Sequence, residues 1–213
     1  MIRIRIMPIV EGHGEVEAVP LLIRRIASTV DPSLVPDILH PIRVPANRLK
    51  KQGELERTVE LAARKLGGIG GIFILVDCDW EGGCPLWDAP GLLERAQVAR
   101  PDVPISLVLA YREYEAWFIA AIESIRSRLQ LVGAVDPVID PEEIRGAKEW
   151  LTSRMPPNLS YVETIHQPAL TALFDMVAAR RSNSFDKCYR EIVSMINTLK
   201  AFQTKSPQPA HSG

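Results

Sequence analysis

Apolar residues follow two patterns along the first half of the chain, short runs and helical repeats. Short apolar or β-branched runs predict strands at Ile2–Val10, Asp37–Val44, Gly71–Val76 and Ile105–Ala110. Apolar residues at helical spacing predict helices between them, at Glu15–Val30, Gly53–Leu66 and Pro90–Arg100. The order βαβαβαβ predicts an α/β fold, a parallel sheet of about four strands flanked by helices with right-handed crossovers.

After Ala110 the pattern predicts helices only. These are expected at Glu113–Leu131, Pro141–Arg154, Pro168–Arg181 and Phe185–Phe202. The chain therefore divides into a core at 1–112, an all-helical C-terminal extension at 113–202 and a polar tail at 203–213 that we expect to be disordered. The extension should pack on the core because its helices carry an apolar stripe, formed by Leu170, Leu173, Phe174 and Val177.

Composition excludes several classes of protein. Apolar residues make up 46% and charged residues 24%, with a net charge of −1, which argues against a uniformly basic protein. Three cysteines do not make a disulfide framework. No apolar run has membrane length, and Arg3 and Arg5 interrupt the N-terminal run, so we expect a cytoplasmic protein without a membrane partner.

Two acidic loops follow predicted strands. The first is EGHGE at Glu11–Glu15, and the second is DCDWEGG at Asp77–Gly83. The carboxyl ends of parallel strands meet at one edge of a sheet, where α/β proteins bind ligands. Carboxylate oxygens are the ligands that magnesium prefers, and its remaining positions can take phosphate oxygens. The sequence therefore predicts that Glu11, Asp77 and Asp79 converge on Mg²⁺ or Mn²⁺.

A Glu-Gly after the first strand and an Asp-x-Asp after the third resemble the Toprim domain of topoisomerases, bacterial primases and the overcoming-lysogenization-defect nucleases. The resemblance implies that Glu11 acts in acid–base catalysis or as a ligand. It also implies that Asp77 and Asp79 bind metal, with Glu81 as a third acid. Because no cleavage domain follows, strand passage is not expected.

The rest of the chain resembles bacterial Toprim-like proteins of unknown function that are often encoded beside an ATPase. The shared features are Glu115–Ala116–Trp117, Lys148 within GAKEWL and the segment Ser182–Phe185. This resemblance implies magnesium-dependent phosphodiester hydrolysis of DNA or RNA, in phage defence with an ATPase partner. Lys148 would then be catalytic by neutralising a phosphate, although it could also extend from its helix without a role.

Further candidates lie beside these loops. Glu113 and Glu115 open a helix at the same sheet edge, where they could bind a second metal or only favour the helix dipole. Gly12, Gly14 and Arg24 are candidate phosphate contacts, and for Arg24 a solvated helix face is the simpler alternative.

Each acidic loop also has a simpler interpretation. Glu11 could be a solvated residue before a helix, and Glu15 and Glu17 resemble ordinary acids of a first helical turn. Asp77 and Asp79 could cap the next helix.

Other ligands fit the sequence less well. A dinucleotide fingerprint fails because Glu17 stands at the third glycine position, and no Walker loop follows. The cysteine spacing does not match a zinc finger, and Cys78 is expected to be buried.

Two rival functions remain beside the nuclease. One is a non-catalytic subunit that binds a nucleotide or a protein partner and keeps the acidic loops as a cation site. The other is a hydrolase of small phosphorylated molecules. The sequence does not distinguish DNA from RNA, because no aromatic-rich or basic nucleic-acid module is visible.

Overall fold

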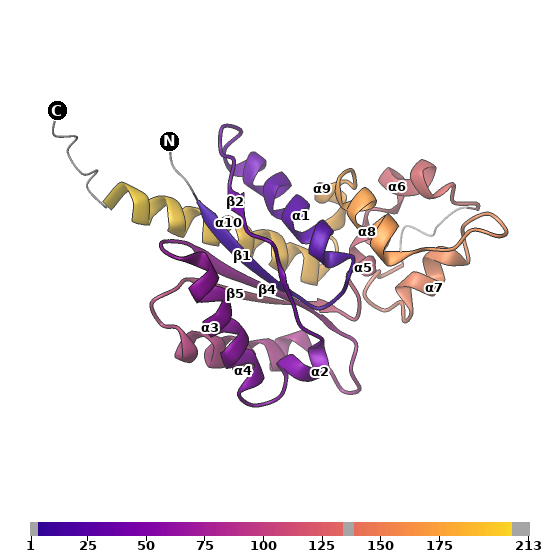
Figure 1. Ribbon diagram of the computed structural model, residues 1–213. Helices are drawn as coiled ribbons and strands as arrows, with labels where there is room; N and C mark the ends of the chain where they lie inside the picture. Colours follow the sequence, from indigo (N-terminus) through magenta and orange to yellow (C-terminus); the bar gives the residue numbers. More distant parts are fainter. Residues whose placement is uncertain (1–3, 134–138, 206–213) are drawn as a thin grey trace.

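A parallel β-sheet forms the centre of the protein, and helices cover both of its faces (Figure 1). The computed structural model describes residues 4–133 and 139–205. Its strands are β1 (Arg5–Val10), β2 (Asp37–Ile38), β3 (Ile42–Arg43), β4 (Gly71–Cys78) and β5 (Ile105–Tyr111). The predicted α/β class with a parallel sheet flanked by helices is confirmed.

The strands are ordered β2-β1-β4-β5, and β3 also pairs with β1. Every strand pairing within the described residues is parallel. The register places Asp77 beside Ala110 and Cys78 beside Tyr111. The loops after β1, β4 and β5 therefore meet at one edge of the sheet, which is where α/β folds place their sites.

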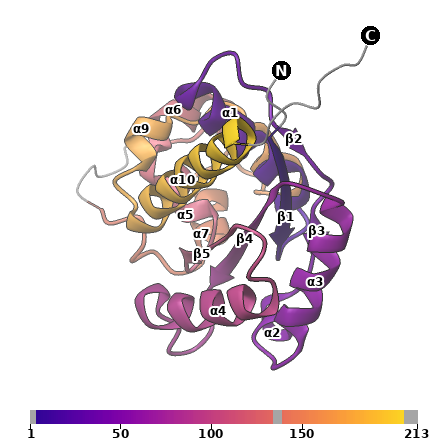
Figure 2. The ribbon, with the colours of Figure 1, turned by 90° about the vertical axis from the view of Figure 1, so that its left-hand side faces the viewer.

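Two helical layers enclose the sheet (Figure 2). One face is covered by α1 (Glu15–Val30) and α10 (Asn183–Lys205), and the other by α3 (Glu54–Leu66) and α4 (Pro85–Ala99). The short helix α2 (Ala46–Leu49) precedes α3. The other helices gather at one end of the molecule: α5 (Glu115–Ala120), α6 (Ile122–Leu129), α7 (Ala147–Thr152), α8 (Glu163–Thr171) and α9 (Met176–Ala179).

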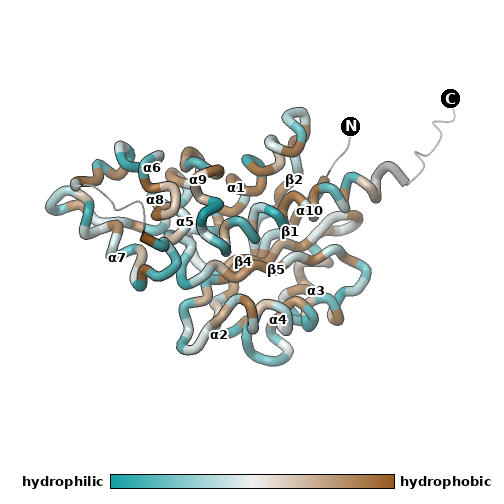
Figure 3. Tube along the Cα trace, turned by 180° about the vertical axis from the view of Figure 1, so that it is seen from behind, coloured by the Kyte–Doolittle hydropathy of each residue, from teal (hydrophilic) through white to brown (hydrophobic). Residues whose placement is uncertain are grey.

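Side chains of β4 alternate between two hydrophobic cores, because successive residues of a strand point to opposite faces. Phe73 and Leu75 join the core that contains α1 and α10, whereas Ile72 and Ile74 join the core that contains α3 and α4. Figure 3 shows the hydrophobic colouring of the sheet between these layers. By the same alternation Asp77 leaves the strand on the α1 side, at the edge where α1 begins.

The second predicted strand, Asp37–Val44, is wrong as one element. It is divided into β2 and β3, which both pair with β1. Pro41 lies in the gap, and proline has no N–H for a strand ladder. The first strand begins at Arg5, and residues 2 and 3 of the predicted strand lie outside the described part of the chain.

Several predicted helix bounds are also wrong. The helix predicted at 90–100 begins at Pro85, because this proline takes the first helical turn. The one predicted at 113–131 is divided at Ala121 into α5 and α6. The one predicted at 141–154 is reduced to α7, which follows Gly146 in a left-handed conformation.

The last two helices are displaced as well. The helix predicted at 168–181 is replaced by α8, which starts earlier, and by α9, which Asp175 caps through hydrogen bonds from two backbone N–H groups. The final helix extends to Lys205, and the rest of the predicted tail, 206–213, lies outside the described residues.

Only two of the four residues in the predicted apolar stripe of the extension are buried. Leu170 and Phe174 are fully buried in the core with α1 and α10, but Leu173 and Val177 are exposed, because the chain breaks between α8 and α9. In the described part of the chain, no helix has the length and apolar character needed to cross a membrane.

This difference gives a matched test of packing. Leu170→Ala should lower the free energy of unfolding by about 2–5 kcal/mol, because it leaves a cavity in the core. Leu173→Ala, the same change three residues later at an exposed position, should change it by no more than about 0.5 kcal/mol. Denaturant unfolding measures both, and equal losses would contradict the packing of α8 described above.

Candidate functional site

An acidic cavity of about 230 Å³ lies at the carboxyl edge of the sheet. The loops after β1 and β4 form one side, and α7 and α8 of the extension form the other. Carboxylates dominate its lining: Glu11, Glu15, Asp77, Asp79 and Glu163. Its permanently cationic lining residues are Arg43 and Lys148. The core and the extension therefore share one site with an excess of negative charge.

The two predicted acidic loops contact each other directly. The Glu11 carboxylate accepts a hydrogen bond from the backbone N–H of Asp77 at 3.1 Å. One oxygen of Asp77 accepts from the backbone N–H of Tyr114 at 2.9 Å, which joins the loop after β5 to the same place. Asp79 is exposed and lines the same cavity. The structure thus places Glu11, Asp77 and Asp79 in the lining of one cavity, and their convergence on a metal ion stays a prediction.

Glu15 lies deeper than either loop. It is buried, and its carboxylate accepts hydrogen bonds from the backbone N–H groups of Glu11 at 2.9 Å and Gly12 at 3.1 Å. The sequence interpretation as an ordinary first-turn acid missed this residue. Its spacing was a signal, because Glu15 continues the buried stripe of α1 that includes Val19, Leu22 and Ile26.

The extension closes the other side of the cavity through α8. Glu163 accepts a hydrogen bond from the backbone N–H of Gly14 at 2.9 Å and lies 3.4 Å from the Lys148 ammonium. Gln167, one turn later, is buried and also lines the cavity. Neither residue was predicted, because α8 was expected to begin at Pro168. Both lie on the stripe that continues into Leu170 and Phe174.

Glu115 is the most enclosed acid of the site. One of its oxygens accepts hydrogen bonds from the Tyr161 hydroxyl at 2.8 Å and from the Gln167 amide at 3.3 Å. The other lies 3.9 Å from the Lys148 ammonium and is buried without a hydrogen-bond partner, as is the amide oxygen of Gln167. Two buried acceptors therefore have unused hydrogen-bonding capacity beside the cavity.

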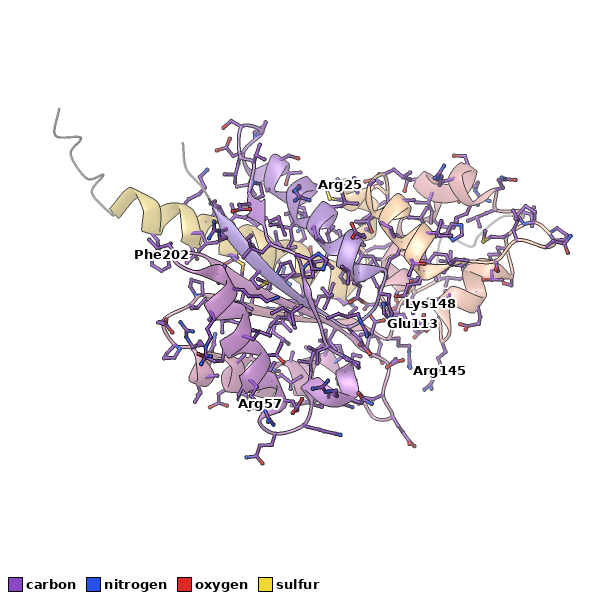
Figure 4. The ribbon with its side chains drawn as sticks, in the orientation of Figure 1. Arg25, Arg57, Glu113, Arg145, Lys148 and Phe202 are labelled. Atoms are coloured by element: carbon purple, nitrogen blue, oxygen red, sulfur yellow. The ribbon has the colours of Figure 1, made fainter. Side chains whose placement is uncertain are left out.

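Lys148 faces several carboxylates from the first turn of α7. Its backbone N–H donates to Glu113 at 3.4 Å, and Figure 4 shows the two side by side at the end of the molecule where α7 lies. Burial alone would lower the pKa of Lys148, but Glu115, Asp77 and Glu163 together raise it above its usual value. Lys148 is therefore a permanent cation inside an acidic cluster.

The pKa values of the carboxyl groups are also raised, which favours their neutral form. Burial, assisted by Glu11 and Glu115, raises the pKa of Glu15 from 4.5 to about 8. Burial also raises the pKa of Glu115 to about 7 and that of Asp77 well above 3.8. Burial is also the main cause that raises the pKa of Glu11. The shared cause is charge taken out of water, and one lysine does not compensate it fully.

Other predicted residues lie less centrally. Glu81 is exposed, and Glu113 is half-buried beside Lys148; neither lines the cavity. Arg24 is exposed on α1 and is likewise absent from the lining. The N–H groups of Gly12 and Gly14 are used by protein carboxylates.

The donor set fits a hard cation in its chemistry. Oxygen ligands surround the cavity, their charge exceeds that of the facing cations, and two buried oxygens lack partners. Within residues 4–133 and 139–205, however, no three His, Cys, Asp or Glu side chains already stand as a group that could hold a metal ion. Binding would therefore require side chains such as the exposed Asp79 to turn inward.

Comparison with known proteins finds no relative of this chain. No protein-family model matches it, and searches of curated proteins and of solved structures find no match either. The geometry and chemistry of the cavity must therefore support any functional conclusion.

Because the loop after β1 lies in close contact with α8, a side chain added at Gly14 should destabilise the protein. A Cβ added there would lie 2.3 Å from the Gln167 amide oxygen and 2.8 Å from the Glu163 carbonyl oxygen. Gly14→Ala should therefore lower the free energy of unfolding by about 1–3 kcal/mol. Gly91→Ala is the control, since its Cβ meets nothing within 4 Å and alanine should stabilise α4 by about 0.5–1 kcal/mol. Denaturant unfolding that shows both changes neutral would contradict this contact.

The raised carboxyl pKa values predict how stability depends on pH. In the folded protein Glu15 keeps a proton that the unfolded chain loses above pH 4.5, so stability without metal should fall as pH rises from 4.5 to about 8. Thermal melts in chelator should show the fall, and Glu15→Gln should make it shallower. Glu17→Gln, an exposed neighbour on α1, should leave the slope unchanged. A Glu15→Gln slope equal to that of the wild type would contradict the prediction.

Proposed function

We propose that this protein is a magnesium-dependent nuclease of Toprim type that hydrolyses phosphodiester bonds in nucleic acid. The observation that supports the proposal most is the cluster of partly or fully buried carboxylates at the carboxyl edge of a parallel sheet, with Lys148 in their midst. Such a cluster is costly to bury unless a cation or a substrate interacts with it.

Particular residues suit the proposed cation. Glu11, Asp77 and Asp79 would hold it, and Glu15 could supply a further oxygen from the interior of the cavity. Magnesium or manganese, when bound there, would neutralise the charge that develops on phosphate oxygens.

The protein's own groups have separate roles in this proposal. Lys148 donates to a phosphate oxygen, since its ammonium faces the cavity and remains charged. Glu11 has a raised pKa and lies at the cavity, so it suits proton transfer to or from a reacting oxygen. Arg43 on the β3 side would bind a neighbouring phosphate. The proposed setting is the cytoplasm, in phage defence with an ATPase partner, and this part rests on the family resemblance alone.

The rival function is a non-catalytic subunit that binds a nucleotide or a protein partner and keeps the acidic cavity as a cation site. One observation favours it: the backbone N–H groups of Gly12 and Gly14, the candidate phosphate contacts, already donate to Glu15 and Glu163. The two functions differ in whether a reaction occurs after the cation binds.

Activity provides the test. The purified protein should cleave single-stranded DNA or RNA with magnesium or manganese and should not cleave either in chelator. Glu11→Gln should reduce the rate by about 100-fold or more, because it removes a ligand and a proton-transfer group together. Glu17→Gln is the matched control, an exposed acid six residues later, and should keep the wild-type rate.

Two outcomes would contradict the nuclease. Equal cleavage by the wild type and Glu11→Gln would indicate a contaminant or another site. Absence of cleavage by both the wild type and the control, while calorimetry shows manganese bound to the wild type, would favour the binding subunit.

A further inference from the structure

A second cavity lies along β5. Its volume is about 560 Å³, within the range of small-molecule pockets. We call it the β5 pocket and define it by residues of β5, α4 and α10: Leu107, Leu109, Tyr111, Leu86, Ala89 and Asn183. Aliphatic residues of β5 and α4 and the Tyr111 ring line it together with polar and charged groups, which are Glu142 and, on α10, Asn183, Asp186, Lys187 and Arg190. This combination suits a planar ligand with polar edges.

The β5 pocket extends to the carboxyl edge of the sheet at Tyr111. Tyr111, which lines the pocket, pairs in register with Cys78, the residue after Asp77. The two cavities share no lining residue. By the alternation along the strands, Tyr111 and Cys78 face the α3 and α4 side of the sheet, whereas Asp77 faces the α1 side, so the β5 pocket is a site of its own.

Arg112 lies beside Tyr111 at the end of β5, and among the described residues its charge has no ion-pair partner. Within the part of the chain that the structure describes, its side-chain Nε is buried without a hydrogen bond. Its guanidinium lies 5.1 Å from the centre of the Tyr111 ring. Other partly buried arginines are well satisfied: Arg25 donates to two backbone carbonyls, and Arg95 donates to the Glu56 carboxylate.

The backbone of Arg112 is also strained. Its φ is +65°, in the left-handed region that a residue with a Cβ rarely adopts. A strained backbone and an unsatisfied buried donor both destabilise the fold, and such features gather at ligand sites. An anion is the best partner for the Arg112 guanidinium. A phosphate can accept two parallel hydrogen bonds from its N–H groups.

We infer that the β5 pocket binds an unpaired nucleobase of the nucleic-acid substrate, and that Arg112 binds a phosphate of the same nucleotide. This inference rests on the proposed function and adds a substrate class to it. A base stacked inside a duplex cannot enter a pocket between two helices, so the preferred substrate is single-stranded or has frayed ends.

The test uses three small probes in chelator, so that no cleavage interferes. Calorimetry should show that AMP and TMP each bind the wild type at least 10-fold more tightly than ribose 5-phosphate, which has the same phosphate and sugar but no base. Ala89→Leu should fill the pocket and reduce the nucleotides to the affinity of ribose 5-phosphate. Leu86→Asp should also weaken nucleotide binding. Leu86 is 81% exposed, so this change leaves the core intact.

Arg112→Gly separates a ligand role from a structural one. Glycine adopts the left-handed conformation readily, so the melting temperature should not fall, whereas all three probes should bind at least 10-fold more weakly. Arg57→Gln is the control; this exposed arginine of α3 lies far from Lys148 and Glu113 in Figure 4 and should bind all probes like the wild type.

The outcomes separate this inference from the proposed function. Equal binding of AMP, TMP and ribose 5-phosphate by the wild type would overturn the base pocket, even if the protein cleaves nucleic acid. An Arg112→Gly protein that loses stability but keeps its affinity for the probes would overturn the phosphate role. Base-dependent binding by a wild type that cleaves nothing would support the pocket and contradict the nuclease.

Discussion

The site depends on one lysine that lies among carboxylates withdrawn from water. Lys148 is within 4 Å of Glu115 and Glu163, and its charge also acts on Asp77. Removing one such carboxylate from water costs several kcal/mol, and a single nearby ammonium offsets only part of that cost for a group of them. The cluster therefore holds some of its acids in the protonated form near neutral pH, and a cation that binds there must displace those protons.

This shared lysine also explains why the extension cannot be regarded as an accessory. Lys148 comes from α7, and Glu163 comes from α8, while Asp77 comes from the sheet. Glu163 bonds the N–H of Gly14, and the absence of a Cβ at Gly14 lets α8 approach the loop. Packing of the helices and assembly of the charged cluster are therefore the same event.

The sequence predicted the sheet well because its signals are local. Apolar runs identify β1, β4 and β5, and parallel pairing then places the loops of Glu11 and Asp77 at one edge. It failed where tertiary structure decides.

The failures have physical causes. Pro41 divides a predicted strand, and a break between α8 and α9 exposes half of a predicted stripe. The acids on helices were underestimated for another reason. Glu15 and Glu163 are polar residues at helix positions that face the protein interior. A prediction that sorts residues by polarity alone therefore places them on the surface. Burial of a carboxylate depends on partners from distant segments, which local periodicity cannot reveal.

The order of residues along the chain has a consequence for synthesis. A ribosome releases the loops of Glu11 and Asp77 long before α7 and α8, so the nascent chain presents hydrated carboxylates with neither their lysine nor the wall that encloses them. The enclosed site arises only when the C-terminal helices emerge and dock. The site for which we propose hydrolysis therefore stays unassembled until α7 and α8 have been synthesised.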